Sequence, residues 1–133
     1  MHRRNFLVLT ASGLALALTP WGLSSCNSRT KWSEVLAMPS MLGRFCAEAE
    51  LLTIGDMYLK IQKEETSEDV LIEKLLLLPD DRLFEPSSEA ELQSYLTSQI
   101  ENDFEKDDTL VIDGWVISRT EARQCALYFL THS

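Results

Sequence analysis

Two short apolar segments joined by Asp113-Gly114 impose the tightest constraint on the fold of this 133-residue chain. Leu110-Val111-Ile112 and Trp115-Val116-Ile117 consist of residues that favour strands, and Asp-Gly is a preferred pair for a two-residue hairpin turn. Directly afterwards, Ser118 and Glu121 have the spacing of a helix capping box. A two-stranded hairpin is not stable alone, so we expect it to pack against helices.

Helical apolar patterns fill the rest of the chain after residue 38. We expect a first helix over residues 39–61, with a kink or a break between Ile54 and Asp56, because glycine costs about 1 kcal/mol inside a helix. A cap at residues 66–69 begins a second helix, which runs over 70–78 and stops at Pro79. The prediction is a mainly α domain over residues 39–133: a small bundle of about four helices with one short β-hairpin before the last helix.

The third predicted helix begins with the capping-box pair Ser88 and Glu91. Its core-facing stripe recurs every four residues, at Leu92, Leu96, Ile100 and Phe104. The acidic run over 101–108 lacks the glycine and glutamate spacing of an EF-hand, so we interpret it as a solvated helix end. The all-leucine turn over 75–78 is either core or a partner contact.

The N-terminus has the features of an export signal. Arg3-Arg4 is followed after one residue by Phe6-Leu7 and then by an apolar run to Leu18, with no acid before Glu34. Adjacent arginines in this setting indicate the twin-arginine type of signal, which the translocase for folded cargo reads. The run from Leu7 to Leu18 is shorter than the ~20 residues needed to cross a bilayer core.

The apolar run ends in Leu23-Ser24-Ser25-Cys26, which resembles a bacterial lipobox. Lipidation of Cys26 makes residues 1–25 a twin-arginine-type lipoprotein signal peptide and residues 26–38 a lipidated tether. The alternative is an unmodified cysteine in a periplasmic protein that is cleaved at another site. We expect an exported protein on the periplasmic face of a membrane, held there through more than one acyl chain.

Charge narrows the classes of partner. The chain carries 12 Lys and Arg against 21 Asp and Glu, a formal charge of −9, and loss of Arg3 and Arg4 with the signal makes it −11. Such an acidic chain repels phosphate backbones, which excludes nucleic-acid binding. After lipidation of Cys26, the remaining thiols are Cys46 and Cys125 on the first and last predicted helices. An exported domain permits a disulfide between them, and two separate buried thiols are the alternative.

Reactive groups are sparse in the sequence. Beyond the signal there is one histidine, His132, and no C-x-x-C, H-E-x-x-H or glycine-rich phosphate loop. We therefore predict no catalytic residues, no metal ligands and no cofactor, and a protein that is not an enzyme. Trp115 is either a core residue or a partner contact, since tryptophan is enriched at binding hot spots. Arg119 and Arg123 are expected to pair with acids on a neighbouring helix.

Three segments resemble the small subunit of membrane-associated flavin-dependent sugar and alcohol dehydrogenases, as in sorbitol and glucose dehydrogenase complexes. They are Arg3-Arg4-x-Phe6-Leu7, Ile54-Gly55-x-x-Tyr58-Leu59, and the stretch over 110–130. In the last of these, residues 111–122, which end in Thr120-Glu121-Ala122, look like the family's hydrophobic stretch before a Thr-x-Glu-Ala helix start. Trp115 lies within that hydrophobic stretch, whereas the family often places Trp-Tyr ahead of it. The chain departs from the family in two further respects. It lacks the family's extended C-terminal tail, and its lipobox is not a general feature of the family.

The resemblance implies a small helical subunit that assists the export of a large flavin-bearing catalytic subunit and supplies no catalytic residue. The leading hypothesis is thus a non-catalytic lipoprotein, an accessory or escort subunit for a folded flavoprotein dehydrogenase. The alternative is a stand-alone envelope lipoprotein that acts as a protein-interaction adaptor.

Overall fold

A computed structural model describes residues 32–133. The signal residues Arg3, Arg4, Phe6 and Leu7 and the lipidation residue Cys26 lie outside the described part. After a helical turn over residues 32–36, the elements are η2 (Leu42–Arg44), α2 (Glu48–Ile61), α3 (Glu68–Leu76), α4 (Glu89–Glu105), β1 (Thr109–Ile112), β2 (Trp115–Ser118) and α5 (Arg119–His132). The described residues are mainly helical, with a two-stranded antiparallel hairpin before the last helix, as predicted.

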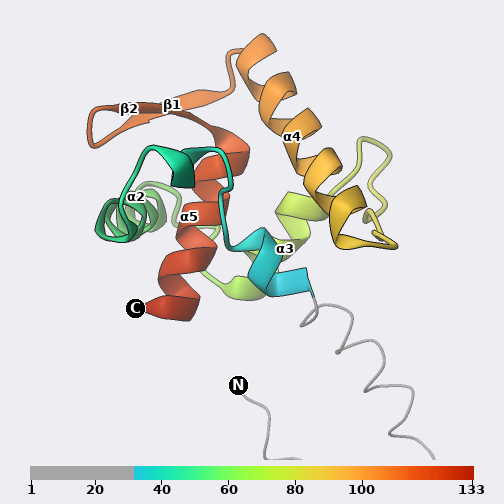
Figure 1. The fold of residues 1–133 in the computed structure, drawn as a ribbon, viewed down its shortest axis with the longest axis horizontal. Coiled ribbons are helices and arrows are strands. Elements are labelled where there is room, and N and C mark those ends of the chain that lie inside the picture. The colour runs from blue at the N-terminus through green and yellow to red at the C-terminus, as the bar shows by residue number, and fades with distance from the viewer. Residues whose placement is uncertain (1–31) are drawn as a thin grey trace, which may run out of the picture. The chain divides into compact units, whose positions relative to one another are not determined.

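Helix α5 occupies the centre of the domain and contacts α2, α3, α4 and both strands (Figure 1). A helix with neighbours on several sides is buried around most of its circumference. Buried residues of α5 accordingly run without interruption from Thr120 to Ala122 and from Gln124 to Tyr128. The sequence predicted a single apolar stripe for this helix, and the additional buried positions include the polar residues Thr120, Glu121 and Gln124.

The first predicted helix was too long at its N-terminus, and the observed helix has no break at Gly55. Residues 39–47 form the 3-10 turn η2 and a following bend, and α2 begins only at Glu48. Of the apolar side chains expected to face the core there, Leu42 is buried, whereas Met41 and Phe45 are exposed. The carboxyl group of Glu121 accepts a hydrogen bond from the backbone of Leu42, which fixes η2 against α5.

Gly55 lies inside the continuous helix α2 and marks the closest approach of α2 to α5. A Cβ atom at this position would lie 2.7 Å from the carbonyl carbon of Cys125 and 2.9 Å from Cβ of Phe129, and closer still to the Cys125 carbonyl oxygen. The missing side chain therefore allows two helix backbones to pack together, and α2 runs through Gly55 without a break.

Helices α3 and α4 begin at the predicted caps but differ at their ends. Ser67 and Ser88 accept hydrogen bonds from the amides of Val70 and Glu91. Helix α3 stops at Leu76, two residues early, because Leu77 pairs with Leu83 in an antiparallel bridge. In α4 the side chains of Leu92, Leu96 and Ile100 are buried.

Phe104 is 45% exposed, contrary to its predicted place in the core stripe. A four-residue step overshoots one helical turn by about 40°, so three steps carry the side chain roughly 120° around the helix. The stripe that begins at Leu92 therefore leaves the core before it reaches Phe104.

The hairpin forms at the predicted residues. Ile112 pairs with Trp115 across the two-residue turn, and the register continues through Val111 with Val116 to Thr109 with Ser118. Asp113 and Gly114 have φ values of 54° and 84°, the pair of positive angles that a type I′ turn requires. Ser118 then ends β2 and caps α5 by accepting the amide proton of Glu121.

We predict that Gly55→Ala destabilises the domain by about 3 kcal/mol or more, because the neighbouring atoms belong to the backbone of α5 and cannot move aside as a flexible side chain would. Gly43→Ala is the matched control, since nothing lies within 4 Å of the added Cβ. Chemical denaturation of both variants measures the effect. Equal unfolding free energies for the two variants would show that the close approach at Gly55 carries no constraint.

Candidate functional site

The two faces of the hairpin have different environments. Paired residues of an antiparallel ladder point to the same side, and successive residues alternate. Leu110, Ile112, Trp115 and Ile117 therefore share the inner face, where Ile112 and Ile117 are each 1% exposed. On the outer face, Val111 and Val116 lie opposite each other and are 72% and 61% exposed. We call the outer surface formed by these two residues the valine face.

The valine face departs from the ordinary pattern of an antiparallel sheet, in which the solvent side carries polar residues. Two β-branched apolar side chains at directly opposed positions form a contiguous patch, not isolated exposed residues. In the ribbon view the hairpin lies along one edge of the domain, next to α2 (Figure 1). The valine face is the surface that we consider as the candidate site.

Carboxyl groups lie at the turn end of the hairpin. The side chain of Glu50, in the first turn of α2, forms a hydrogen bond with Asp113. That bond, together with partial burial and the charge of Asp113, raises the pKa of Glu50, and a hydrogen bond from Trp115 opposes the rise. Trp115 thus joins the inner face of the hairpin to α2. Its side chain is half-exposed, and its contact with a partner stays a prediction.

The base of the hairpin is fixed by acids from the end of α4. Asp103 accepts hydrogen bonds from the amide and the hydroxyl of Thr120, both at 2.8 Å, and so caps the start of α5. Asp108 pairs with Arg119 at 3.2 Å. The interpretation of the whole 101–108 run as a solvated helix end was therefore wrong for these two residues. The carboxyl groups of Asp103 and Asp108 are instead engaged by Thr120 and Arg119.

Asp107 ends α4 with a positive φ of 61°. The amide of Asp108 donates to the carbonyl oxygen of Asp103, and the amide of Asp107 donates to that of Phe104. This pair of bonds is the Schellman arrangement, which reverses the chain directly after a helix. Strand β1 begins two residues after Asp107, at Thr109.

A polar network behind the hairpin joins four parts of the chain. Arg123 donates through Nε and Nη2 to the two carboxylate oxygens of Glu65, at 2.9 and 3.1 Å. The hydroxyl of Tyr58 donates to Glu65 at 2.9 Å and accepts from Arg119 at 3.3 Å. Tyr58 is 0% exposed and Glu65 is 5% exposed. Arg119 also binds Asp108, so the network ties the base of the hairpin to α2.

The electrostatics of this network favour its charged form. Burial alone would raise the pKa of Glu65, but the hydrogen bonds and charge of Arg123, with the Tyr58 hydroxyl, outweigh it and lower that pKa below its ordinary value. Burial dominates for Glu121 instead and raises its pKa, despite hydrogen bonds from Ser118 and Leu42. Arg119 and Arg123 pair with acids as expected, but these acids lie in loops and not on a neighbouring helix.

Cys46 and Cys125 are both free thiols in the structure, so the disulfide that the sequence permitted is not formed there. Cys125 is buried in α5 and Cys46 is half-buried before α2. Burial, followed by the charges of Glu121 and Cys46, raises the pKa of Cys125. A thiol with a raised pKa is a weak nucleophile.

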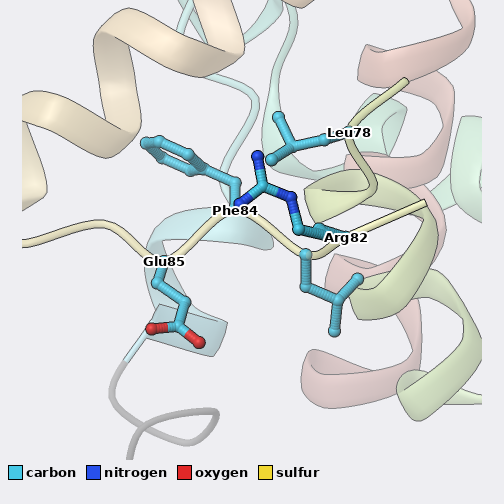
Figure 2. Close-up of a pocket in the computed structure, with 5 residues that line it drawn as sticks. Leu78, Arg82, Phe84 and Glu85 are labelled. Carbon is cyan, nitrogen blue, oxygen red and sulfur yellow. The ribbon is translucent and has the colours of Figure 1, made fainter. Parts of the chain in front are cut away.

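A surface hollow of about 520 Å³ lies in the loop between α3 and α4. It is lined by Leu78, Arg82, Leu83, Phe84 and Glu85. Figure 2 shows the Arg82 guanidinium between Leu78 and Phe84, whereas the Glu85 carboxylate points away from them. Arg82 pairs with Asp80 at 2.8 Å, and Phe84 stacks on Tyr95. The lining side chains do not converge on one point, as the polar groups of a ligand site do.

Within residues 32–133 there is no group of three or more side chains arranged to hold a metal ion. Over the same residues, none of the helices has the length and apolar character needed to span a membrane. Comparisons of the chain with protein-family models, curated proteins and solved structures gave no match. The resemblance to the dehydrogenase small subunits therefore rests on the sequence segments named above.

Sequence reasoning missed the valine face, although the signal was present. Once Asp113-Gly114 is placed in a two-residue turn, the register follows, and a single buried residue such as Ile112 assigns Val111 and Val116 to the opposite face. The network of Tyr58 and Glu65 offered no such signal. Tyr58 and Arg119, which are hydrogen-bonded in this network, are 61 positions apart in the sequence.

We predict that Glu65→Gln lowers the unfolding free energy at neutral pH by about 2–3 kcal/mol, because Arg123 loses a buried charged partner. Asp80→Asn, which breaks the exposed pair with Arg82, is the control and should change it by less than about 0.5 kcal/mol.

The pH dependence of the Glu65→Gln effect has a defined sign. Because the pKa of Glu65 is lowered on folding, its stabilisation is complete above the unfolded-state pKa and is lost as pH falls through the folded-state pKa. The difference between the wild type and Glu65→Gln should therefore shrink in acid. Urea unfolding at neutral and acidic pH tests this, and a difference that grows on acidification contradicts it.

Proposed function

We propose that this protein is a non-catalytic accessory subunit, exported in the folded state and lipid-anchored at Cys26, that escorts a flavin-dependent dehydrogenase. The observation that carries the proposal is the valine face, an apolar patch held on a rigidly attached hairpin. Directly opposed apolar side chains on the solvent side of a hairpin are available for contact with a partner protein. The twin-arginine motif at Arg3 and Arg4 supports the folded-cargo route, because it selects proteins that fold before transport.

The fold supports a binding role in a second way. The hairpin is held at its turn by the hydrogen bond of Trp115 with Glu50, and at its base by Arg119 with Asp108 and Tyr58. A surface that is rigid before binding loses little conformational entropy when a partner docks. The choice of a flavoprotein as the partner rests on the resemblance of the sequence segments to the dehydrogenase small subunits.

We predict that affinity purification from gently solubilised native membranes recovers a large flavoprotein in stoichiometric amount, together with a bait whose intact mass begins at acylated Cys26. Mass spectrometry of the bait and an absorption spectrum of the complex are the measurements. Replacing Arg3 and Arg4 together by Lys is the matched control, because lysines keep the positive charge that a general secretion signal needs but remove the twin arginines.

The double-lysine bait should stay unprocessed and inside the cell. A lipidated wild-type bait that is recovered alone contradicts the escort function and favours the stand-alone adaptor. A wild-type bait that lacks the acyl groups contradicts the lipid anchor.

A further inference from the structure

The charged residues in and beside the hairpin are mostly acidic. At the turn end, Asp113 is exposed and lies beside Glu50. At the base, Glu105 and Asp107 are exposed, and Lys106 is the one basic residue in the sequence between Glu105 and Ser118. The patch is therefore apolar in its middle and acidic at both ends.

A second copy of this chain is a poor occupant of such a surface. A two-fold contact places the same patch against itself, so Asp113 and Glu50 of one copy would face acids of the other. A bilayer surface is disfavoured for the same reason, because anionic lipids repel acidic residues. A complementary surface has the opposite arrangement, apolar at its centre and basic at its rim. Protein surfaces supply that arrangement readily, since arginine is enriched at interfaces.

We infer that the valine face binds a folded partner protein whose contact surface is apolar at its centre and carries Lys or Arg at its rim. This inference rests on the proposed function and specifies the chemistry of the partner's contact site. Val111 and Val116 supply the apolar contact, and a basic side chain of the partner lies next to the neighbouring carboxyl groups of Glu50 and Asp113. Complementary charge of this kind raises the rate of association and fixes orientation.

The first test is photo-crosslinking in the full-length lipoprotein in native membranes, with Val116→p-benzoylphenylalanine as the probe. The expected adduct joins position 116 to an exported folded protein, and its crosslinked peptide lies next to Lys or Arg on that protein's surface. Ile61→p-benzoylphenylalanine is the control. Ile61 is 53% exposed at the far end of α2, about 16 Å along the helix from Glu50, and should give no such adduct. An adduct of position 116 with a second copy or with lipid overturns the inference.

The second test uses variants that keep the hairpin intact. Thr has the shape and β-preference of Val, so Val111→Thr with Val116→Thr should leave the melting temperature unchanged and lower partner recovery about tenfold. Asp113→Asn keeps a residue that accepts the left-handed turn and removes its charge. It should weaken partner recovery a few-fold at low ionic strength, with the deficit vanishing at high salt.

Asp81→Asn is the matched control for charge, because Asp81 is also exposed and also has a positive φ, 68°, but lies in the loop between α3 and α4. It should leave partner recovery unchanged. If the wild type recovers a partner and the valine and Asp113 variants recover it equally well, the location is wrong and the escort function stands. If the wild type recovers no partner, the proposed function fails and the inference fails with it.

Discussion

The direct contact between the backbones of α2 and α5 at Gly55 is the constraint on which the remaining packing depends. With no side chain between them, the carbonyl group of Cys125 lies against α2. Tyr58 follows Gly55 by one turn of α2 and thereby comes within hydrogen-bonding distance of Arg119 near the start of α5. The small side chains of Ala122, Cys125 and Ala126 on α5 are all buried in this region. A larger residue at position 55 would move Tyr58 out of the polar network as well as separate the helices.

The polar network connects the packed helices α2 and α5 to the base of the hairpin and holds the hairpin in place. Glu65 is buried with two hydrogen bonds from Arg123 and one from Tyr58, so its charge is matched where an isolated carboxylate would be costly. Arg119 extends the network to Asp108 at the base of the hairpin. The outward position of the valine face thus depends on charged groups that lie on its opposite side. The buried charged network around Glu65 and the exposed valine face are therefore held by one connected set of contacts.

Local signals predicted most of the elements, and long-range contacts account for most of what they missed. Caps at Ser67, Ser88 and Ser118 and the Asp113-Gly114 turn involve residues within a few positions of one another, so the sequence identifies them directly. The late start of α2 could not be read locally, because it depends on Glu121 binding the backbone of Leu42. Gly55 was misread for the same reason: its role is set by Cys125, 70 positions away in the sequence.

For the candidate site too, some features could be predicted from the local sequence and others depend on long-range contacts. Alternation along β1 and β2 is a local property, and it places Val111 and Val116 on the outer face once one inward residue is known. The acids around that face are visible in the sequence, but their functions are not. Asp103 and Asp108 are committed to α5 and Arg119, whereas Asp107 and Asp113 remain exposed, and only the three-dimensional contacts separate the two groups.

The central place of α5 also has a consequence for the order in which the domain can form. A ribosome makes α2, α3, α4 and the hairpin before the helix on which they pack. At about 5–20 residues per second, the apolar side chains of α2 wait several seconds for their partner surface. Nascent chains that have not yet extended through α5 therefore present Leu51, Ile54 and Tyr58 without a core to receive them. Folding of this domain is coupled to the synthesis of α5, and the growing chain that lacks α5 is the state in which it most needs protection.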